Sequence, residues 1–375
     1  MITIIADDKI PFLKGALEPF ASIRYMAGGK INHEAVEQAD AMLIRTRTIC
    51  NESLLSGSRV KFIATATIGF DHIATDYCAA NSIHWTNAPG CNAASVQQYI
   101  ASVLATLARR NNFSLAGKIL GIVGVGHVGK KVETLARLFG MKVLLNDPPR
   151  SRSEGDSAFV PLEQILAESD IVTLHVPLNR TGEDKTFHLI NETTFGFIKP
   201  DAWLINSSRG EVVKSEALKS ALANGRLSGA VLDVWENEPS VDEQLLEKVT
   251  IATPHIAGYS TDGKRNGTVK VVRSLGKYFN FPVDNWEPSS LPEPENPVII
   301  LDFLNNPLEK LVNHAILSTY DVTGDDFRFR SNHGEFEKLR GNYPVRREFP
   351  AFKISLSAHS APLKAILQEL GFSFV

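Results

Sequence analysis

The sequence predicts an α/β protein with two doubly wound parallel-sheet domains and a small α+β domain at the C-terminal end. Three observations lead to this prediction. Short runs of β-branched residues alternate with helical patterns over most of the chain, which is typical of parallel βαβ units. Three glycines stand at GxGxxG spacing from residue 124. The 375 residues exceed what one hydrophobic core usually serves, so several domains are expected.

The first domain is predicted to be discontinuous, formed by residues 1–92 and 259–283, with a flavodoxin-like parallel sheet. Its N-terminal part alternates the strand-like runs "ITIIAD", "AMLIRT" and "VKFIATAT" with the helical patterns "HEAVEQAD", "ESLLSGS" and "ATDYCAANS". Its second part is a helix over 261–281 that begins at a Ser or Thr cap. That helix returns the chain to the first domain.

The second domain is predicted over residues 93–258 as a Rossmann-type domain. A long helix opens it, because Val96, Ile100, Val103, Leu104 and Leu107 are apolar at helical spacing. Six strand candidates follow: "ILGIVGV", "KVLLND", "IVTLHV", "AWLINSS", "GAVLDV" and "VTIATP". Most are separated by a helical pattern or a turn, as a doubly wound dinucleotide-binding sheet requires.

A Pro-rich linker is expected at residues 284–297, followed by a third domain over 298–375. The third domain combines a helix in "NPLEKLVNHAIL", a polar loop in "DVTGDDFRFRSNHGE", a strand in "FKISLSA" and a closing helix in "APLKAILQELGF". No catalytic cluster is visible in it, so assembly or bracing is its plainest role.

Composition excludes several classes of function. The net charge of −3, with acidic and basic residues mixed along the chain, does not indicate a nucleic-acid partner. Cys50, Cys78 and Cys91 are scattered, which argues against disulfides and fits a reducing, cytoplasmic compartment. His72, His84, His127 and His175 lack the His or carboxylate spacing of metal ligands, so no metal site is expected. The short apolar N-terminus predicts a first strand rather than a signal peptide, and no run is long enough for a membrane span.

The glycine segment predicts a dinucleotide site. Gly124 allows a tight turn, Gly126 lets the backbone approach a pyrophosphate, and Gly129 lets the following helix pack on the strand. The N–H groups at the helix N-terminus then face the phosphates. Asp147 ends the next strand at the expected distance, where a carboxylate binds the ribose hydroxyls and disfavours NADP relative to NAD. Arg150 is the one nearby cation that a 2′-phosphate would use.

Three polar residues that follow later strands predict hydride-transfer chemistry on a 2-hydroxy acid. His255 is the candidate base for the hydroxyl proton. Glu238 would orient His255 and stabilise its charged form. Arg209 would hold the substrate carboxylate through its planar guanidinium. Carboxyl ends of parallel strands form the crevice of an open α/β sheet, so we expect the three side chains to meet.

The segments "GKILGIVGVGHVGKKV", "INSSRGEVVKSEALKSAL", "GAVLDVWENEP" and "TPHIAGYS" resemble the D-isomer-specific 2-hydroxyacid dehydrogenases, with matches from about residue 2 to 281. The resemblance implies an NAD-dependent enzyme. With "RTRTICNESLL", "FIATATIGFDHI" and "NAPGCNA", it implies oxidation of 4-phospho-D-erythronate to 3-hydroxy-2-oxo-4-phosphooxybutanoate in vitamin B6 biosynthesis, and a C-terminal domain that forms a homodimer.

The resemblance also implies roles for individual residues. Arg209, Glu238 and His255 would be catalytic. The predicted NAD site comprises Gly124, Gly126, His127, Val128, Gly129, Asp147, Val176, Ser207, Ser208, Arg209, Asp233 and Gly258. The predicted substrate site comprises Arg45, Thr46, Thr67 and Tyr259.

Other functions share much of this pattern. A 3-phosphoglycerate dehydrogenase or a glyoxylate or hydroxypyruvate reductase would use the same Arg, Glu and His. A non-enzymatic NAD-sensing interaction protein is also compatible with the fold, because fold does not fix function. Arg45, Thr46 and Thr67 favour an enzyme that acts on a phosphorylated substrate, since Arg and Thr side chains bind phosphate oxygens.

Overall fold

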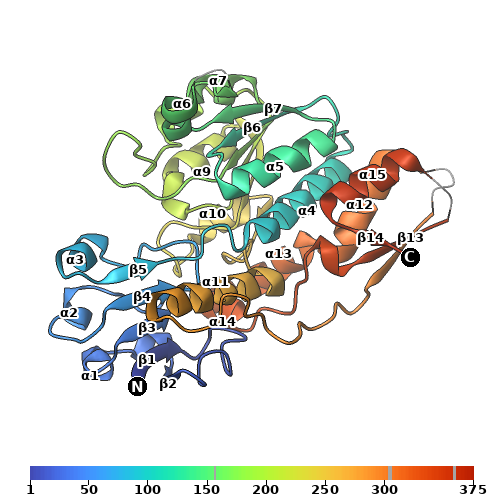
Figure 1. Ribbon diagram of the computed structural model, residues 1–375. Coiled ribbons are helices and arrows are strands. Elements are labelled where there is room, and N and C mark those ends of the chain that lie inside the picture. Colours follow the sequence, from blue (N-terminus) through green and yellow to red (C-terminus); the bar gives the residue numbers. More distant parts are fainter. Residues whose placement is uncertain (156–157, 303–305, 358–359) are drawn as a thin grey trace. The chain divides into compact units, whose positions relative to one another are not determined.

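The computed structural model describes residues 1–155, 158–302, 306–357 and 360–375 (Figure 1). They form two compact units, Met1–Asn92 with Ser260–Pro292, and Ala93–Tyr259 with Glu293–Val375. Within these described ranges, no helix has both the length and the apolar character needed to cross a bilayer. The division into a substrate domain, a Rossmann domain, a linker and a C-terminal domain stays a prediction. The two units are described one at a time below.

The first unit is built on a five-stranded sheet in the order β2-β1-β3-β4-β5, with every strand pair parallel. This is the doubly wound order 2-1-3-4-5 typical of flavodoxin-like folds. Its elements are β1 (Ile2–Asp7), β2 (Ala21–Met26), η1 (Gly28–Lys30), α1 (His33–Val36), β3 (Ala41–Ile44), α2 (Glu52–Leu55), β4 (Phe62–Thr65), α3 (Thr75–Ala80), β5 (His84–Thr86) and α11 (Thr261–Phe279).

Each face of this sheet has its own apolar core. Val271, Val272 and Leu275 of α11 pack with residues of β1, β3 and β4 on one side. The second core joins the opposite face to the segments that carry α1, α2 and α3. Helix α11 begins where a cap was expected, because the Ser260 side chain accepts a hydrogen bond from Gly263 N. Helix α11 therefore belongs to the first compact unit.

The second unit contains a six-stranded parallel sheet in the order β11-β10-β9-β8-β6-β7. The strand order reverses at β6, which has β7 on one side and β8 on the other, and such a switch point is where open sheets bind ligands. Its elements are α4 (Ala93–Asn111), β6 (Ile119–Val123), α5 (His127–Leu138), β7 (Lys142–Asn146), α6 (Pro148–Glu154), α7 (Leu162–Glu168), β8 (Ile171–Leu174), α8 (Glu192–Phe195), β9 (Ala202–Asn206), η3 (Gly210–Val212), α9 (Ser215–Ala223), β10 (Leu227–Leu232), α10 (Glu243–Lys248) and β11 (Ile251–Ala252).

The C-terminal part of this unit adds a small parallel sheet, β12-β13-β14, with helices. The expected α+β character is confirmed. Its elements are β12 (Val298–Leu301), α12 (Leu308–Thr319), α13 (Val322–Ser331), η4 (His333–Glu335), α14 (Phe336–Gly341), η5 (Phe349–Ala351), β13 (Lys353–Leu356), α15 (Ala361–Leu370) and β14 (Ser373–Phe374).

The polar loop expected at residues 321–335 is wrong, because this segment is mostly helical. Asp321 caps α13 by accepting a hydrogen bond from Thr323 N. The helix shows no apolar stripe because several of its buried positions are charged. Asp325 is 3 % exposed and pairs with Arg328, and Asp326 is 9 % exposed and pairs with Arg330. Helical periodicity in hydropathy is lost when carboxylates occupy the buried positions.

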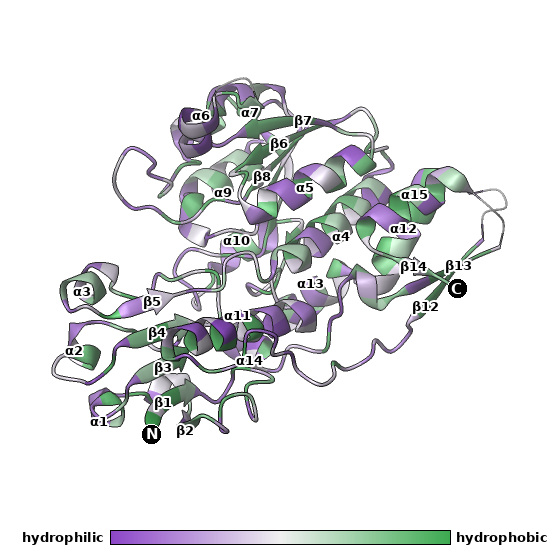
Figure 2. Ribbon diagram, viewed as in Figure 1, coloured by the Kyte–Doolittle hydropathy of each residue, from purple (hydrophilic) through white to green (hydrophobic). Residues whose placement is uncertain are grey.

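Helix α4 joins the two parts of the second unit into one core. Its apolar residues pack in the same cluster as β6, α5 and the C-terminal residues Leu311, Ile316 and Leu367. Most of the helix is buried on every side, and Figure 1 shows α12 and α15 beside α4 and α5. Figure 2 shows hydrophilic residues along α5, whereas the neighbouring strands β6 and β7 are mainly hydrophobic.

Replacing Gly129 with alanine is expected to destabilise the second unit. An added Cβ would overlap the carbonyl oxygen of Gly124 and force α5 away from the strand. We expect G129A to lower the free energy of unfolding by about 1–3 kcal/mol, as overpacking does, measured by urea denaturation. In G126A the added Cβ has no described atom within 4 Å. Because Gly126 is the N-cap of α5, where alanine is less favourable than glycine, this control should lose at most about 1 kcal/mol, and equal losses in both variants would contradict the steric argument.

Candidate functional site

The turn after β6 has the shape that a bound phosphate group requires. Gly124 has a φ of +88°, and an added Cβ would lie 2.6 Å from the carbonyl oxygen of His175. Gly126 is the N-cap of α5 and no side chain caps this helix. His127 is exposed and Val128 is half-buried in the first turn. The first-turn N–H groups of α5 are therefore not occupied by a capping side chain, as an anion site at a helix N-terminus needs.

Asp147 lies beside this turn. Its Oδ2 accepts a hydrogen bond from Val125 N at 2.8 Å, and its Oδ1 accepts one from Arg150 N at 3.1 Å. The Arg150 guanidinium donates to Val125 O at 2.7 Å and pairs with Glu154 at 2.5 Å. Because Arg150 is committed to these partners, the charge next to the turn is that of the Asp147 carboxylate, which suits NAD rather than NADP.

The loop after β9 is organised by a residue that the sequence analysis missed, Asn206. Its Oδ1 accepts hydrogen bonds from the N–H and hydroxyl of Ser208, and its Nδ2 donates to Arg209 O at 2.8 Å. Among the described residues the buried Ser207 Oγ has no hydrogen-bond partner. A buried hydroxyl without a partner is costly. It fits a site where a bound polar ligand completes the hydrogen bond. Val176 lies across the glycine turn, beside Gly124.

Three adjacent strands bring the predicted catalytic residues to one edge of the sheet. Arg209 follows β9, Glu238 follows β10 and His255 follows β11. Gly210 makes the close approach possible, because an added Cβ would overlap the backbone of Trp235. The loop that carries Arg209 therefore contacts the loop that leads to Glu238.

His255 and Glu238 form a direct pair. The imidazole Nδ1 lies 2.7 Å from Glu238 Oε2, and Glu238 Oε1 accepts a hydrogen bond from Trp235 N at 3.0 Å. Trp235 in turn donates from its indole to Thr253 O at 3.0 Å. With Nδ1 held by the carboxylate, Nε2 is the nitrogen left for proton exchange.

Glu238 stays ionised in this setting. Burial opposes its ionisation, but the His255 charge, the hydrogen bonds from His255 and Trp235, and the charge of Arg340 outweigh burial, so the pKa of Glu238 lies below its usual range. Burial lowers the pKa of His175 to about 3. His175 is thus too weak a base for proton abstraction near neutral pH, whereas His255 has a carboxylate partner.

The turn that carries His255 is held by Asp233. The Asp233 carboxylate is 1 % exposed and accepts hydrogen bonds from Thr253 Oγ1, Ile256 N and Ala257 N at 2.6–2.8 Å. His255 itself has a φ of +57°, a left-handed conformation that non-glycine residues rarely adopt. These bonds stabilise that conformation. Gly258, in the same turn, is half-buried.

The predicted substrate residues divide between the two units. In the first unit, Arg45 and Thr46 follow β3, and Thr67 follows the neighbouring β4. Thr46 is exposed, and Arg45 Nη1 donates to Lys9 O at 3.2 Å. The Thr67 hydroxyl donates to Gly69 O at 2.9 Å. In the second unit, Tyr259 closes the turn of His255, with its N–H bonded to Ile256 O.

The sequence analysis did not identify Asn206, Gly210, Trp235 and Thr253, which position the predicted catalytic groups rather than react. Asn206 and Gly210 lie within the segment "LINSSRGEVV" and Trp235 within "LDVWENEP", but a supporting hydrogen bond leaves no spacing pattern of its own.

Comparisons with known proteins agree with this geometry. Residues 93–257 match the family model "D-isomer specific 2-hydroxyacid dehydrogenase, NAD binding domain", and residues 290–371 match a "Domain of unknown function (DUF3410)". The chain is 48 % identical over 355 residues to the erythronate-4-phosphate dehydrogenase of Bacteroides fragilis, covering 94 % of this chain and 99 % of that protein. It is 40 % identical to that of Pseudomonas entomophila, covering 99 % of both.

A solved structure is also similar. D-Lactate dehydrogenase from Aquifex aeolicus, complexed with NAD and lactic acid, aligns with a TM-score of 0.62 and 27 % identity, over 75 % of this chain and 96 % of that chain. The predicted fold class and the NAD cofactor are confirmed.

The substitution Glu238→Gln tests the role of the His255–Glu238 pair. A neutral amide neither stabilises an imidazolium nor fixes the tautomer, so we expect kcat to fall about 100-fold or more. The reduction should persist from pH 6 upwards, because, against the effect of burial, the charge of His255 and the hydrogen bonds from His255 and Trp235 hold the pKa of Glu238 below its usual range, and the wild-type carboxylate stays ionised. Steady-state NADH formation measures it.

Glu236→Gln is the matched control. Glu236 forms a similar pair with His188 at 2.6 Å, and its other carboxylate oxygen accepts a hydrogen bond from Ser215 N of α9 at 2.7 Å, so its carboxylate is bonded to His188 and α9 rather than to His255. We expect E236Q to keep wild-type kcat. Equal losses in both variants would mean that the loop, and not the proton-exchanging pair, is what the substitutions disturb.

Proposed function

Because the chain belongs to the erythronate-4-phosphate dehydrogenases of the D-isomer-specific 2-hydroxyacid dehydrogenase family, we propose that it oxidises 4-phospho-D-erythronate to 3-hydroxy-2-oxo-4-phosphooxybutanoate in vitamin B6 biosynthesis. The single observation that carries the reaction type is the 2.7 Å pair between His255 Nδ1 and Glu238. These two residues follow β11 and β10, and Arg209 follows β9, the other neighbour of β10. Oxidation of a hydroxy acid needs an oriented imidazole that accepts the hydroxyl proton and a cation that binds the substrate carboxylate.

Bound NAD supplies the hydride acceptor. His255 Nε2 takes the proton of the C2 hydroxyl, and Glu238 stabilises the charge that His255 gains. Arg209 holds the substrate carboxylate and polarises the oxygen from which the proton leaves. Gly124, Gly126 and the first turn of α5 hold the pyrophosphate, Asp147 the ribose hydroxyls, and Ser207 offers its unpaired hydroxyl to the cofactor.

The phosphate of the substrate is assigned to the carboxyl ends of β3 and β4. Arg45 supplies a guanidinium and Thr46 an exposed hydroxyl on the loop after β3. Thr67 supplies a second hydroxyl after β4. Arginine binds phosphate oxygens in a bidentate manner, and threonine hydroxyls add short hydrogen bonds.

The substrate is tested by NADH formation with purified protein, comparing 4-phospho-D-erythronate, 3-phosphoglycerate and D-glycerate. A 2-keto acid is added so that bound NADH is reoxidised. We expect turnover with the erythronate phosphate, and a loss of about 100-fold or more in His255→Ala. Preference for another acid would support the same reaction type and refute 4-phospho-D-erythronate as the substrate. Silence on all three acids, with NAD still bound, would favour a non-enzymatic NAD-binding role.

We also propose a cytoplasmic homodimer that assembles through the C-terminal sheet. The three cysteines are free and buried, which suits a reducing compartment. On β12, Ile299 and Leu301 are buried, whereas Val298 is 45 % and Ile300 is 72 % exposed. An edge strand with apolar residues on its outer face is a favourable surface for a second copy of the chain.

The double variant V298E/I300E is expected to be monomeric in light scattering after size exclusion, because two carboxylates replace apolar contact area on β12. Phe327→Glu is the control, since Phe327 is 73 % exposed on α13, away from β12. It should remain dimeric. A wild-type monomer, or dissociation of both variants, would count against this interface.

A further inference from the structure

The C-terminal part of the second unit holds the segment that carries His255. On β11, Ala252 N donates to Asp326 Oδ1 at 2.7 Å. Three residues after β11 comes His255, and two residues further Ala257 O accepts a hydrogen bond from Arg346 at 2.5 Å. Arg346 is only 4 % exposed and also donates to Ser95 Oγ of α4. The catalytic turn is thus held by Asp233 from within its own sheet and by α13 and Arg346 from the C-terminal part.

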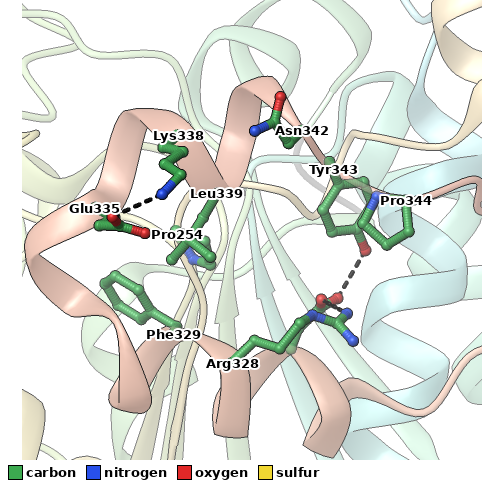
Figure 3. Close-up of a pocket in the computed structure, with 10 residues that line it drawn as sticks. Pro254, Arg328, Phe329, Glu335, Lys338, Leu339, Asn342, Tyr343 and Pro344 are labelled. Atoms are coloured by element: carbon green, nitrogen blue, oxygen red, sulfur yellow. Dashed lines mark hydrogen bonds and ion pairs between the residues drawn. The ribbon is translucent and has the colours of Figure 1, made fainter.

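The cavity in Figure 3 lies where the C-terminal part contacts the segment that carries His255. It has a volume of ≈ 150 Å³ and is lined by Pro254, which precedes His255, and by residues of α13, α14 and the loop after α14. Its cations are engaged, since Lys338 pairs with Glu335 at 2.8 Å and Arg328 pairs with Asp325. Tyr343 donates to Asp325 at 2.7 Å. The charged side chains of the cavity wall therefore neutralise one another, and the wall includes Pro254, next to His255.

Arg340, in the last turn of α14, is a cation directed at this turn. Its guanidinium carbon lies 5.5 Å from the centroid of the Tyr259 ring and 5.6 Å from that of Phe336. Its Nη1 donates to Glu337 at 3.0 Å, and its side chain is 16 % exposed. Among the described residues the buried Arg340 Nε has no hydrogen-bond partner. Glu337 is itself 43 % exposed, so solvent weakens its neutralisation of the guanidinium charge.

The positive charge of Arg340 acts on the catalytic pair. Burial raises the pKa of Glu238, and the His255 charge, the hydrogen bonds from His255 and Trp235 N, and then the Arg340 charge lower it. Conversely, Tyr259, Glu337, Glu238 and Asp233 together raise the pKa of Arg340 against the effect of burial. Arg346 also carries charge near Asp233. Arg209, on the loop after β9, is a further cation on the side of the sheet.

We propose that Arg340, supplied by the domain of unknown function, is a positioning residue that fixes Tyr259 and makes proton uptake by the His255–Glu238 pair less favourable. The inference rests on the proposed function. When the pair takes the hydroxyl proton, its net charge changes from −1 to 0, and a nearby cation favours the state with the charge of −1. Arg340 therefore keeps the pair unprotonated, and competent as a base, at lower pH.

The test compares the pH profile of kcat/KM for wild type, Arg340→Met, Arg340→Lys and the control Lys338→Met. Lys338 lies on the same helix with a side chain 65 % exposed, so its loss removes equal charge from the surface. We expect R340M to lose roughly threefold to tenfold at pH 6 and much less at pH 9, with the acidic limb displaced to higher pH. R340K should restore the wild-type midpoint, and K338M should not move it.

A uniform loss at every pH in R340M, or an unchanged profile, would overturn the proposal. If R340M does not fold, Arg340→Gln takes its place with the same expectation. An NMR titration of the His255 imidazole in wild type and variant needs no turnover. This titration separates failure of the inference from failure of the proposed function. A midpoint displaced in the variant, in a protein that does not oxidise 4-phospho-D-erythronate, supports the role of Arg340 and refutes the proposed substrate. An unmoved midpoint refutes Arg340.

Discussion

The second unit depends on the complete burial of α4. Gln98 and Ser102 are fully buried in this helix, so their polar atoms need partners within the protein, and of these atoms Gln98 Oε1 has none among the described residues. Gln98 donates to Thr319 Oγ1 and Arg347 O, and Ser102 Oγ accepts from Val322 N. Each partner belongs to the C-terminal part. Without the C-terminal part, each of these buried polar groups of α4 left unpaired would cost about 1–3 kcal/mol of folding free energy. Helix α4 and the C-terminal part are therefore stable only together.

This shared core fixes where the C-terminal helices meet the six-stranded sheet. Because Val322 N is bonded to α4, the first turn of α13 is placed, and Asp326 then reaches Ala252 on the edge strand β11. The same core orients Arg346 toward Ala257. His255 sits between these contacts in a left-handed conformation that costs about 1–3 kcal/mol by itself. Bonds from both sides keep the imidazole against Glu238.

The sequence was sufficient for features that follow from period and spacing. The two sheets follow from alternating strand and helix patterns, and the convergence of Arg209, Glu238 and His255 follows from their places after successive strands. Strand β2 was missed, because half of "ASIRYM" is polar or aromatic, and β5 because it has only three residues. Helix α13 was taken for a loop, because its buried carboxylates hide the helical period. Asn206 and Gly210 act through single contacts, which no periodicity reveals.

The buried charges of the C-terminal part indicate that it contributes electrostatic interactions as well as apolar packing. Buried ion pairs rarely stabilise a fold better than apolar side chains of the same size. Among the described residues, Arg340 Nε is buried without a hydrogen-bond partner, so stability alone would favour an apolar residue at this position, whereas Arg346 also holds Ser95 and Ala257 O by hydrogen bonds. Both guanidinium groups nonetheless lie against the turn of His255, one on Tyr259 and one on Ala257 O. An electrostatic effect on the proton held by His255 and Glu238 is the property that apolar replacements would not supply.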